Sequence, residues 1–352
     1  MDKIANKETE VFGGGTLGQE NNITALRILA CIMVIGIHVS SIPAIKYCES
    51  LNEKDLNFIL ANFWYGISSP AVPIFVMICG KYALKQKNSN YQEYYSKILK
   101  KIYIPTILWS CIYMILRYYC QNISLKTVIN SAIGGAPFYH LWYLYMMIGI
   151  YLLVPFLVKL KEKIGEKKFK NLGVLLLIIS FIIVLFRDFS TFSQLGILKY
   201  YWKFNQFKFI NYLGYFILGY SLKEVEKKKA IAFLILSIFF LLVSLFFFKE
   251  KYKIIYDNNY IWMVFYSISI YLFFLKIKIK RNNLLSFLEK YSFDIYLLHP
   301  IVLNIILERF LLQEKWLFIR IPSLIIITFI FSLILGIIVK EIIEVLKNKN
   351  YL

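Results

Sequence analysis

The sequence contains few of the residues that build metal sites and disulfides. It has five cysteines and three histidines among 352 residues. The cysteines show no CxxC spacing and no pairing with histidine, so neither a structural disulfide nor a zinc site is predicted. Cys31, Cys79 and Cys111 fall within apolar segments, where cysteine usually serves as a small hydrophobic residue. We therefore expect no metal cofactor.

Acidic residues are also scarce. The chain has 21 Asp and Glu against 41 Lys and Arg, which gives a formal net charge of +20. Such a charge can indicate a nucleic-acid partner, but the basic residues do not gather in one domain. They occur in short groups between apolar runs, as in the loops of membrane proteins. We expect membrane lipid around the chain and no nucleic acid bound to it.

Apolar residues, in contrast, are abundant. Hydrophobic residues make up 59% of the chain and aromatic residues 18%, and the mean hydropathy is +0.60. A soluble domain has no interior large enough to hide this much apolar surface. The composition predicts an all-α integral membrane protein, and no internal repeat, coiled coil or soluble domain interrupts its apolar segments.

About ten transmembrane helices are predicted in one bundle, because a crossing needs about 20 mostly apolar residues. The candidate spans are 23–43, 58–80, 102–120, 139–158, 172–187, 207–222, 230–248, 259–275, 284–309 and 317–340.

Three domains follow from these spans. Residues 1–22, with a glycine-rich patch and mixed charges, are expected to form a disordered cytoplasmic tail that lacks the features of a signal peptide. Residues 23–340 are expected to form the transmembrane domain, and residues 341–352 a short cytoplasmic tail.

The distribution of lysine and arginine predicts the orientation of the bundle. With the N-terminus in the cytoplasm, 26 of the 41 basic residues fall in cytoplasmic segments and 13 in outer loops. Cytoplasmic loops of membrane proteins are enriched in Lys and Arg, so both termini are predicted to be cytoplasmic.

The three histidines fall at one level of this predicted bundle. His38 ends the first span at its outer side, His140 begins the fourth span at that side, and His299 lies in the outer half of the ninth. Imidazole is the side chain best suited to move a proton near neutral pH, and ionisable groups at membrane depth favour a functional interpretation. The alternative for each is a helix-end histidine bonded to backbone or lipid headgroups.

Arg27 shares a helix face with His38. The two residues are eleven apart, so at 100° per residue they point within about 20° of each other. They lie about 16 Å apart along the helix axis. One face of the first span thus carries a permanent cation near the cytoplasm and a titratable base near the outside. The alternative is that Arg27 only extends to the inner headgroups.

Several motifs occur in the order found in acyltransferase family 3, the membrane O-acyltransferases that modify surface glycans, and the chain resembles that family from about Ile23 to about Lys340. The fourth-span motif resembles the branch typified by the enterobacterial common antigen O-acetyltransferase. The motifs are the Arg27 and His38 pair, PAVPIFVMICGKYALKQK (Pro70–Lys87), KKIYIPTILWS with Pro105 and Trp109, FYHLWYLYMMIGIYLLVPFL (Phe138–Leu157), NYLGYFILGYSL (Asn211–Leu222) and YSFDIYLLHPIVL (Tyr291–Leu303).

This resemblance implies transfer of an acyl group, usually acetyl, from cytoplasmic acyl-CoA to an outward-facing hydroxyl in a bacterial cytoplasmic (inner) membrane. It assigns Arg27 and His38 to the family's characteristic pair, with His38 as catalytic base, and places His140 and His299 in later motifs. Asp294 stands where relatives often have glycine. It could pair with a basic group, tune a histidine or reach water at a helix kink.

Acyl transfer to a hydroxyl also needs donors to the oxyanion and a hold on the thioester. His140 or His299 is expected to act as such a donor or as a second proton carrier. Arg27 and Lys81, both near the cytoplasmic face, are candidates to bind the phosphates of CoA. Lys81 equally fits an ordinary cytoplasmic loop cation.

Two aromatic residues beside His140 are candidates for the acceptor site. Trp142 and Tyr143 could stack against a sugar, with a place in the interfacial aromatic belt as the alternative. The acceptor stays open among a cell-surface glycan, a lipid-linked sugar, a peptidoglycan precursor and a small metabolite.

A transporter or flippase of a polysaccharide precursor, without acyl-transfer chemistry, is the main alternative function. Ten spans and buried basic residues fit it as well. A transporter more often shows repeated halves with broken helices, and the sequence has none. A sensory or scaffolding membrane domain gives no reason for three histidines at one depth.

Overall fold

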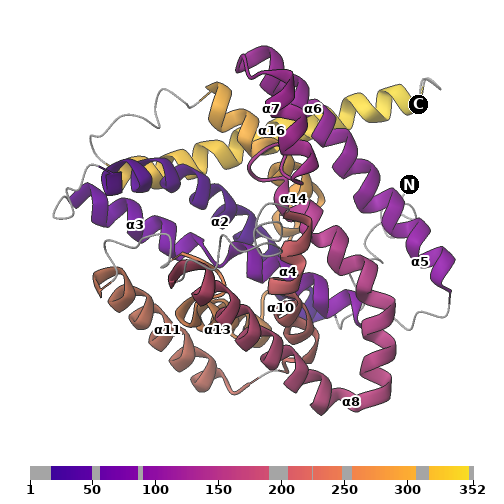
Figure 1. Ribbon diagram of the computed structural model, residues 1–352, viewed down its shortest axis with the longest axis vertical. Coiled ribbons are helices and arrows are strands. Elements are labelled where there is room, and N and C mark those ends of the chain that lie inside the picture. The colour runs from indigo at the N-terminus through magenta and orange to yellow at the C-terminus, as the bar shows by residue number, and fades with distance from the viewer. Residues whose placement is uncertain are drawn as a thin grey trace. The chain divides into compact units, whose positions relative to one another are not determined.

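A computed structural model describes residues 17–49, 56–85, 90–189, 205–223, 225–247, 256–306 and 317–348. Every regular element in these ranges is a helix, so the predicted all-α fold is confirmed for this part of the chain (Figure 1). The elements are α2 (Leu17–Glu49), α3 (Leu56–Ser68), α4 (Ala71–Ala83), α5 (Tyr91–Ile98), η1 (Leu99–Tyr103), α6 (Ile104–Cys120), α7 (Leu125–Ile133), α8 (Trp142–Phe189), η3 (Asn205–Lys208), α10 (Phe209–Ser221), α11 (Lys227–Phe247), α13 (Ile261–Lys276), α14 (Asn283–Ile301), η5 (Val302–Ile306) and α16 (Leu317–Asn348).

Each predicted span overlaps a helix, and the chain is a multi-pass membrane protein. The number ten and the cytoplasmic termini stay predictions, because several helices are too short to cross by themselves. α10 and α13 have 13 and 16 residues, which at 1.5 Å per residue fall short of the roughly 30 Å hydrocarbon core. Five described stretches are long and apolar enough to cross: Asn21–Ser41, Ile59–Ala83, Tyr91–Tyr119, Trp142–Phe186 and Leu317–Leu346.

The segment predicted as a loop between the fourth and fifth spans is helical. It lies within α8, which is interrupted at Gly165, where φ is 78° and ψ is 159°. Glycine adopts this conformation readily, whereas other residues are strained in it. The basic residues of 159–171 therefore continue the two helical parts of α8 beyond their apolar segments. Gly165 alone separates these two parts.

The first helix is longer than the span predicted for it. α2 begins six residues earlier, and Asn21 and Asn22 near its start are buried. The Asn22 amide donates to the carbonyl of Ile277 and accepts from the N–H of Ile279 (2.9 Å), while Asn21 donates to the Ile279 carbonyl (3.3 Å). These side chains satisfy backbone groups of the non-helical segment after α13.

The chain divides into two compact units. Among the described residues, unit 1 comprises 76–85, 90–189 and 205–222, and unit 2 comprises 17–49, 56–75, 223, 225–247, 256–306 and 317–348. Each unit is described by itself below.

Small residues let the helices of unit 1 approach closely. α10 packs along α8 and also crosses the part of α4 that belongs to this unit. A Cβ atom on Gly80 would overlap the carbonyl oxygen of Phe216, and one on Gly219 would overlap that of Met77. Lipid tails are as apolar as the helices themselves, so close backbone packing of this kind is a main source of helix association in membranes.

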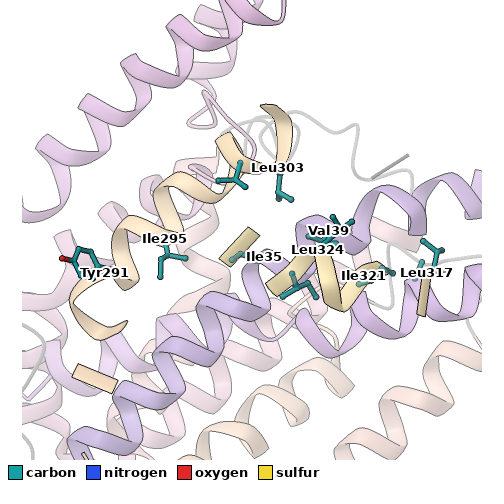
Figure 2. Close-up of a cluster of buried hydrophobic side chains, with 11 residues drawn as sticks. Ile35, Val39, Tyr291, Ile295, Leu303, Leu317, Ile321 and Leu324 are labelled. Atoms are coloured by element: carbon teal, nitrogen blue, oxygen red, sulfur yellow. The ribbon is translucent and has the colours of Figure 1, made fainter. Parts of the chain in front are cut away.

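An apolar cluster holds the helices of unit 2 together. It joins α2 to α3, α14, η5 and α16, and Figure 2 shows Val39 of α2 beside Ile321 and Leu324 of α16. The cluster fixes α2 against α14, the helices that carry His38 and His299. Its members are Ile35, Val39, Ala61, Tyr291, Ile295, Val302, Leu303, Leu317, Ile321, Leu324 and Ile325.

Replacing Gly80 or Gly219 with alanine is expected to destabilise the protein. The added methyl group meets backbone atoms that cannot move aside, and overpacking of this kind costs about 1–3 kcal/mol. The measurement is the thermal unfolding midpoint of the purified protein in detergent, which should fall for both variants. Gly66→Ala is the matched control, because a Cβ there meets Tyr256 at an ordinary 3.5 Å. An equal drop in all three variants would contradict this explanation.

Candidate functional site

Two of the three histidines lie face to face in unit 2. The ring centroids of His38, on α2, and His299, on α14, are 5.3 Å apart, and the rings are inclined by 20°. His38 is partly exposed, whereas the exposed fraction of His299 is 0%. The structure therefore brings these two predicted site residues together.

The backbone of α14 holds His299 in place. Its Nδ1 atom lies 2.7 Å from the carbonyl oxygen of Tyr296. The next residue, Pro300, has no N–H, so the carbonyl four residues before it lacks its usual helical donor. Because a carbonyl only accepts hydrogen bonds, Nδ1 carries the proton of the neutral ring and Nε2 keeps a lone pair. Pro300 thus creates the acceptor that fixes the tautomer of His299.

A wider helical turn follows this histidine directly. The chain passes from α14 into the π-helix η5, which is a turn often found at functional sites. The side-chain amide of Asn304 donates to the carbonyl of Pro300 (2.7 Å). The carbonyl of Pro300 thus has a side-chain donor, which stabilises the irregular turn.

Arg27, at the other end of the α2 face, forms an ion pair with Glu289 of α14. The Nη1 atom of Arg27 lies 3.4 Å from Oε1 of Glu289, and each side chain is 17% exposed. The hydroxyl of Thr24 donates to the same carboxylate oxygen (2.9 Å). Glu289 was not among the predicted site residues, although it lies within the predicted ninth span, 284–309. An acidic residue inside a predicted span was the available signal.

Three contacts in the same order show that α2 and α14 run parallel. The Arg27 and Glu289 ion pair comes first along both helices. The Cys31 thiol follows, donating to the carbonyl of Ser292 (3.4 Å), and the histidine stack comes last. A parallel pair is what the sequence predicts for a first and a ninth span, both of which cross in the same direction.

Asp294 pairs with a cation on α16. Its Oδ2 atom lies 3.0 Å from Nζ of Lys340, which also donates to the carbonyl of Lys290 (2.5 Å) and lies 4.7 Å from the ring centroid of Tyr291. The helices are close here, since a Cβ on Gly336 would lie 3.0 Å from that of Asp294. Of the three interpretations of this acid, the structure supports pairing with a basic group.

His140 lies in unit 1, in aromatic surroundings. It is 2% exposed, and its ring centroid is 4.9 Å from that of Tyr113 and 5.8 Å from those of Phe138 and Tyr139. The edge-to-face geometry of these contacts is a favourable one for aromatic packing. The catalytic role of His140 stays a prediction.

The remaining predicted site residues also lie in unit 1. Nζ of Lys208 stands 5.0 Å from the ring centroid of Trp142, so this indole face already has a cation over it. The hydroxyl of Tyr143 is 4.0 Å from the Cys79 thiol. Lys81 lies in the last turn of α4, where a cation interacts favourably with the helix dipole. Roles in donor or sugar binding stay predictions for Lys81, Trp142 and Tyr143.

The histidine pair has side chains of the type that carry out proton transfer. In the ranges that the structure describes, no three His, Cys, Asp or Glu side chains lie close enough to hold a metal ion. Two stacked imidazoles, one of them partly exposed, can instead accept and pass a proton.

Comparison with known proteins identifies the family. A family model for an acyltransferase domain, Acyl_transf_3, matches residues 20–338. The matched range includes Arg27 and all three histidines. No curated protein and no solved structure matches the chain, and the predicted enterobacterial branch stays a prediction. Because the match covers nearly the whole chain, the protein belongs to acyltransferase family 3 and is a membrane acyltransferase.

Proposed function

We propose that the protein transfers an acyl group of acetyl type from cytoplasmic acyl-CoA to a hydroxyl of a cell-surface glycan or lipid-linked sugar, in a bacterial cytoplasmic membrane. Family membership favours this chemistry over the transporter alternative. The observation that carries the mechanism is the stack of His38 on His299.

His38 acts as the general base in this mechanism. It takes the proton of the acceptor hydroxyl while that oxygen attacks the thioester carbonyl, so that a C–O bond forms and a tetrahedral oxyanion results. The C–S bond then breaks, and the CoA thiolate leaves with the proton that His38 returns. A positioned base of this kind contributes about 10²–10⁴ to the rate.

His299 serves as the second proton carrier. Its bond to the Tyr296 carbonyl leaves the Nε2 lone pair as the accepting site of the neutral ring. Two positively charged rings with centroids 5.3 Å apart repel each other, which favours one proton for the pair. His140 is the alternative for this role.

The donor is expected at the Arg27 end of α2. Guanidinium and ammonium groups bind phosphate by charge-assisted hydrogen bonds, and Arg27 with Lys81 are the candidates for CoA. Arg27 and His38 are about 16 Å apart along the helix, a span that the long pantetheine arm of CoA can bridge. Trp142 and Tyr143 remain the candidates for stacking against the sugar.

Replacing His38 with alanine is expected to lower acyl transfer by about 10²-fold or more, since the base is lost. Alkali-labile acyl groups on envelope glycans would be counted in cells with the intact protein, with His38→Ala at equal membrane abundance, and with no protein. Ser323→Ala, which removes a partly exposed hydroxyl bonded to its own helix, is the control for effects of substitution and expression. Acyl groups that persist in the His38→Ala cells at the intact level would contradict the role of His38.

Two amide substitutions of His299 are expected to separate its roles. In His299→Asn the amide nitrogen can replace Nδ1 and keep the bond to Tyr296, while in His299→Gln the amide group reaches toward the position of Nε2. If Nε2 carries a proton during the reaction, both variants lower kcat by about tenfold or more, because an amide does not titrate near neutral pH. His299→Asn is expected to do so without a change in the thermal unfolding midpoint. Full activity of His299→Asn would assign His299 a structural role only.

A further inference from the structure

Glu289 joins three groups from two parts of unit 2. Its Oε1 atom contacts Arg27 (3.4 Å) and accepts from Thr24 (2.9 Å), both on α2. Its Oε2 atom lies 3.5 Å from Nη2 of Arg281, which precedes α14. One carboxylate therefore holds two guanidinium groups that would otherwise repel each other.

The local structure at the start of α14 directs Arg281 toward Glu289. Asn282 caps the helix by accepting from the N–H of Leu285 (2.7 Å), and Nε of Arg281 donates to the hydroxyl of Ser286 (2.9 Å). The side chain thus folds back over the first turns of the helix. It is 47% exposed, whereas that of Glu289 is 17% exposed, so Arg281 is the member of the cluster that faces solvent.

The charges of this cluster suit an anion. Two arginines and one glutamate leave a net charge of +1. Each guanidinium has five N–H donors in a planar fork that matches the oxygens of a phosphate group. The contacts of Arg281 with Glu289 and Ser286 use only part of its fork.

We propose that Glu289 is a positioning residue, which holds Arg27 beside Arg281 so that the two guanidinium groups bind one phosphate group of the CoA-type donor. This inference rests on the proposed function, because the donor is proposed there. It adds Arg281 as a phosphate-binding residue and assigns Glu289 a role exerted through the arginines.

Removing the charge of Glu289 has opposite consequences under two explanations. If Glu289 positions the arginines, Glu289→Gln frees them from each other and weakens phosphate binding. If Glu289 only competes with phosphate, the same substitution raises the net positive charge and strengthens binding. The sign of the change in affinity therefore decides between the two roles.

The test compares Glu289→Gln, Arg281→Gln and the control Lys280→Gln, which removes an exposed cation one residue from Arg281. Each full-length protein is placed in phosphatidylcholine nanodiscs, and both the Kd for CoA and the kinetics with acetyl-CoA are measured. We expect the Kd for CoA and the KM for acetyl-CoA to rise about tenfold in the first two variants, as for loss of a charge-assisted bond. We expect kcat to stay within about twofold, and Lys280→Gln to change neither constant by more than about twofold. Glu289→Asp should recover part of the affinity.

Each outcome has one meaning. Tighter CoA binding by Glu289→Gln, unchanged binding by it, or no CoA binding by the intact protein would overturn the positioning proposal. If Glu289→Gln does not fold, Arg281→Gln decides, because its exposed side chain tolerates substitution. CoA binding by the intact protein without acyl transfer would overturn the proposed function and leave the phosphate site standing.

Repeating the binding measurement with one third phosphatidylglycerol distinguishes lipid phosphate from donor phosphate. If phosphatidylglycerol abolishes the difference in the Kd for CoA between the intact protein and Arg281→Gln, the cluster binds lipid headgroups, and its assignment to the donor is wrong.

Discussion

The parallel packing of α2 against α14 determines the distances within the candidate site. An ion pair, a thiol-to-carbonyl bond and a ring stack join the two helices at successive levels. Between them and around them lies an apolar cluster that also includes α16. Because the polar contacts depend on one register, a shift of either helix by one turn would separate all of them together. The site is therefore as rigid as the apolar packing of its two helices.

The charged residues of α2 and α14 are paired, as expected for ionisable groups in a membrane protein. An unpaired charge at membrane depth is costly, so such residues face the bundle and pair with one another. Arg27 pairs with Glu289, and Asp294 pairs with Lys340. Removing one partner of a buried pair leaves the other charge uncompensated, which is usually more harmful than replacing both. The two pairs therefore constrain how α14 sits against α2 on one side and α16 on the other.

The sequence predicted those features that depend on neighbours along the chain. Helical periodicity placed Arg27 and His38 on one face of α2, and the basic-residue pattern placed His38 and His299 at one level and on parallel spans. It could not predict their contact, because the two histidines lie in segments more than 250 residues apart, and only the packing of the apolar cluster brings them together. Glu289 was missed for the same reason, since its partners Thr24 and Arg27 lie 265 and 262 residues away.

The ends of the helices were harder to predict than the segments that are helical. Hydropathy marks where a helix is apolar, and not where it ends, so the charged continuation of α8 on both sides of Gly165 was assigned to a loop. The start of α2 was assigned to a tail because residues 1–22 carry a glycine-rich patch and mixed charges, and the buried Asn21 and Asn22 fall within that range. They bind the backbone of Ile277 and Ile279, and such a partner is visible only in three dimensions. A polar residue at the end of a membrane helix can thus find its hydrogen-bond partners in the backbone of a non-helical segment, as well as in lipid headgroups or water.

The pairing of histidine with proline in α14 shows how one local feature carries chemical information. Proline at position 300 removes a backbone donor, which leaves the carbonyl of Tyr296 available to the preceding histidine side chain. The bond fixes which ring nitrogen of His299 bears the proton, and the stack places that ring against His38. No role was predicted for Pro300 from the sequence. The acceptor for His299 could have been located from the sequence, because the carbonyl that loses its helical donor lies four residues before Pro300. A neutral histidine held in this way accepts its next proton at Nε2 alone.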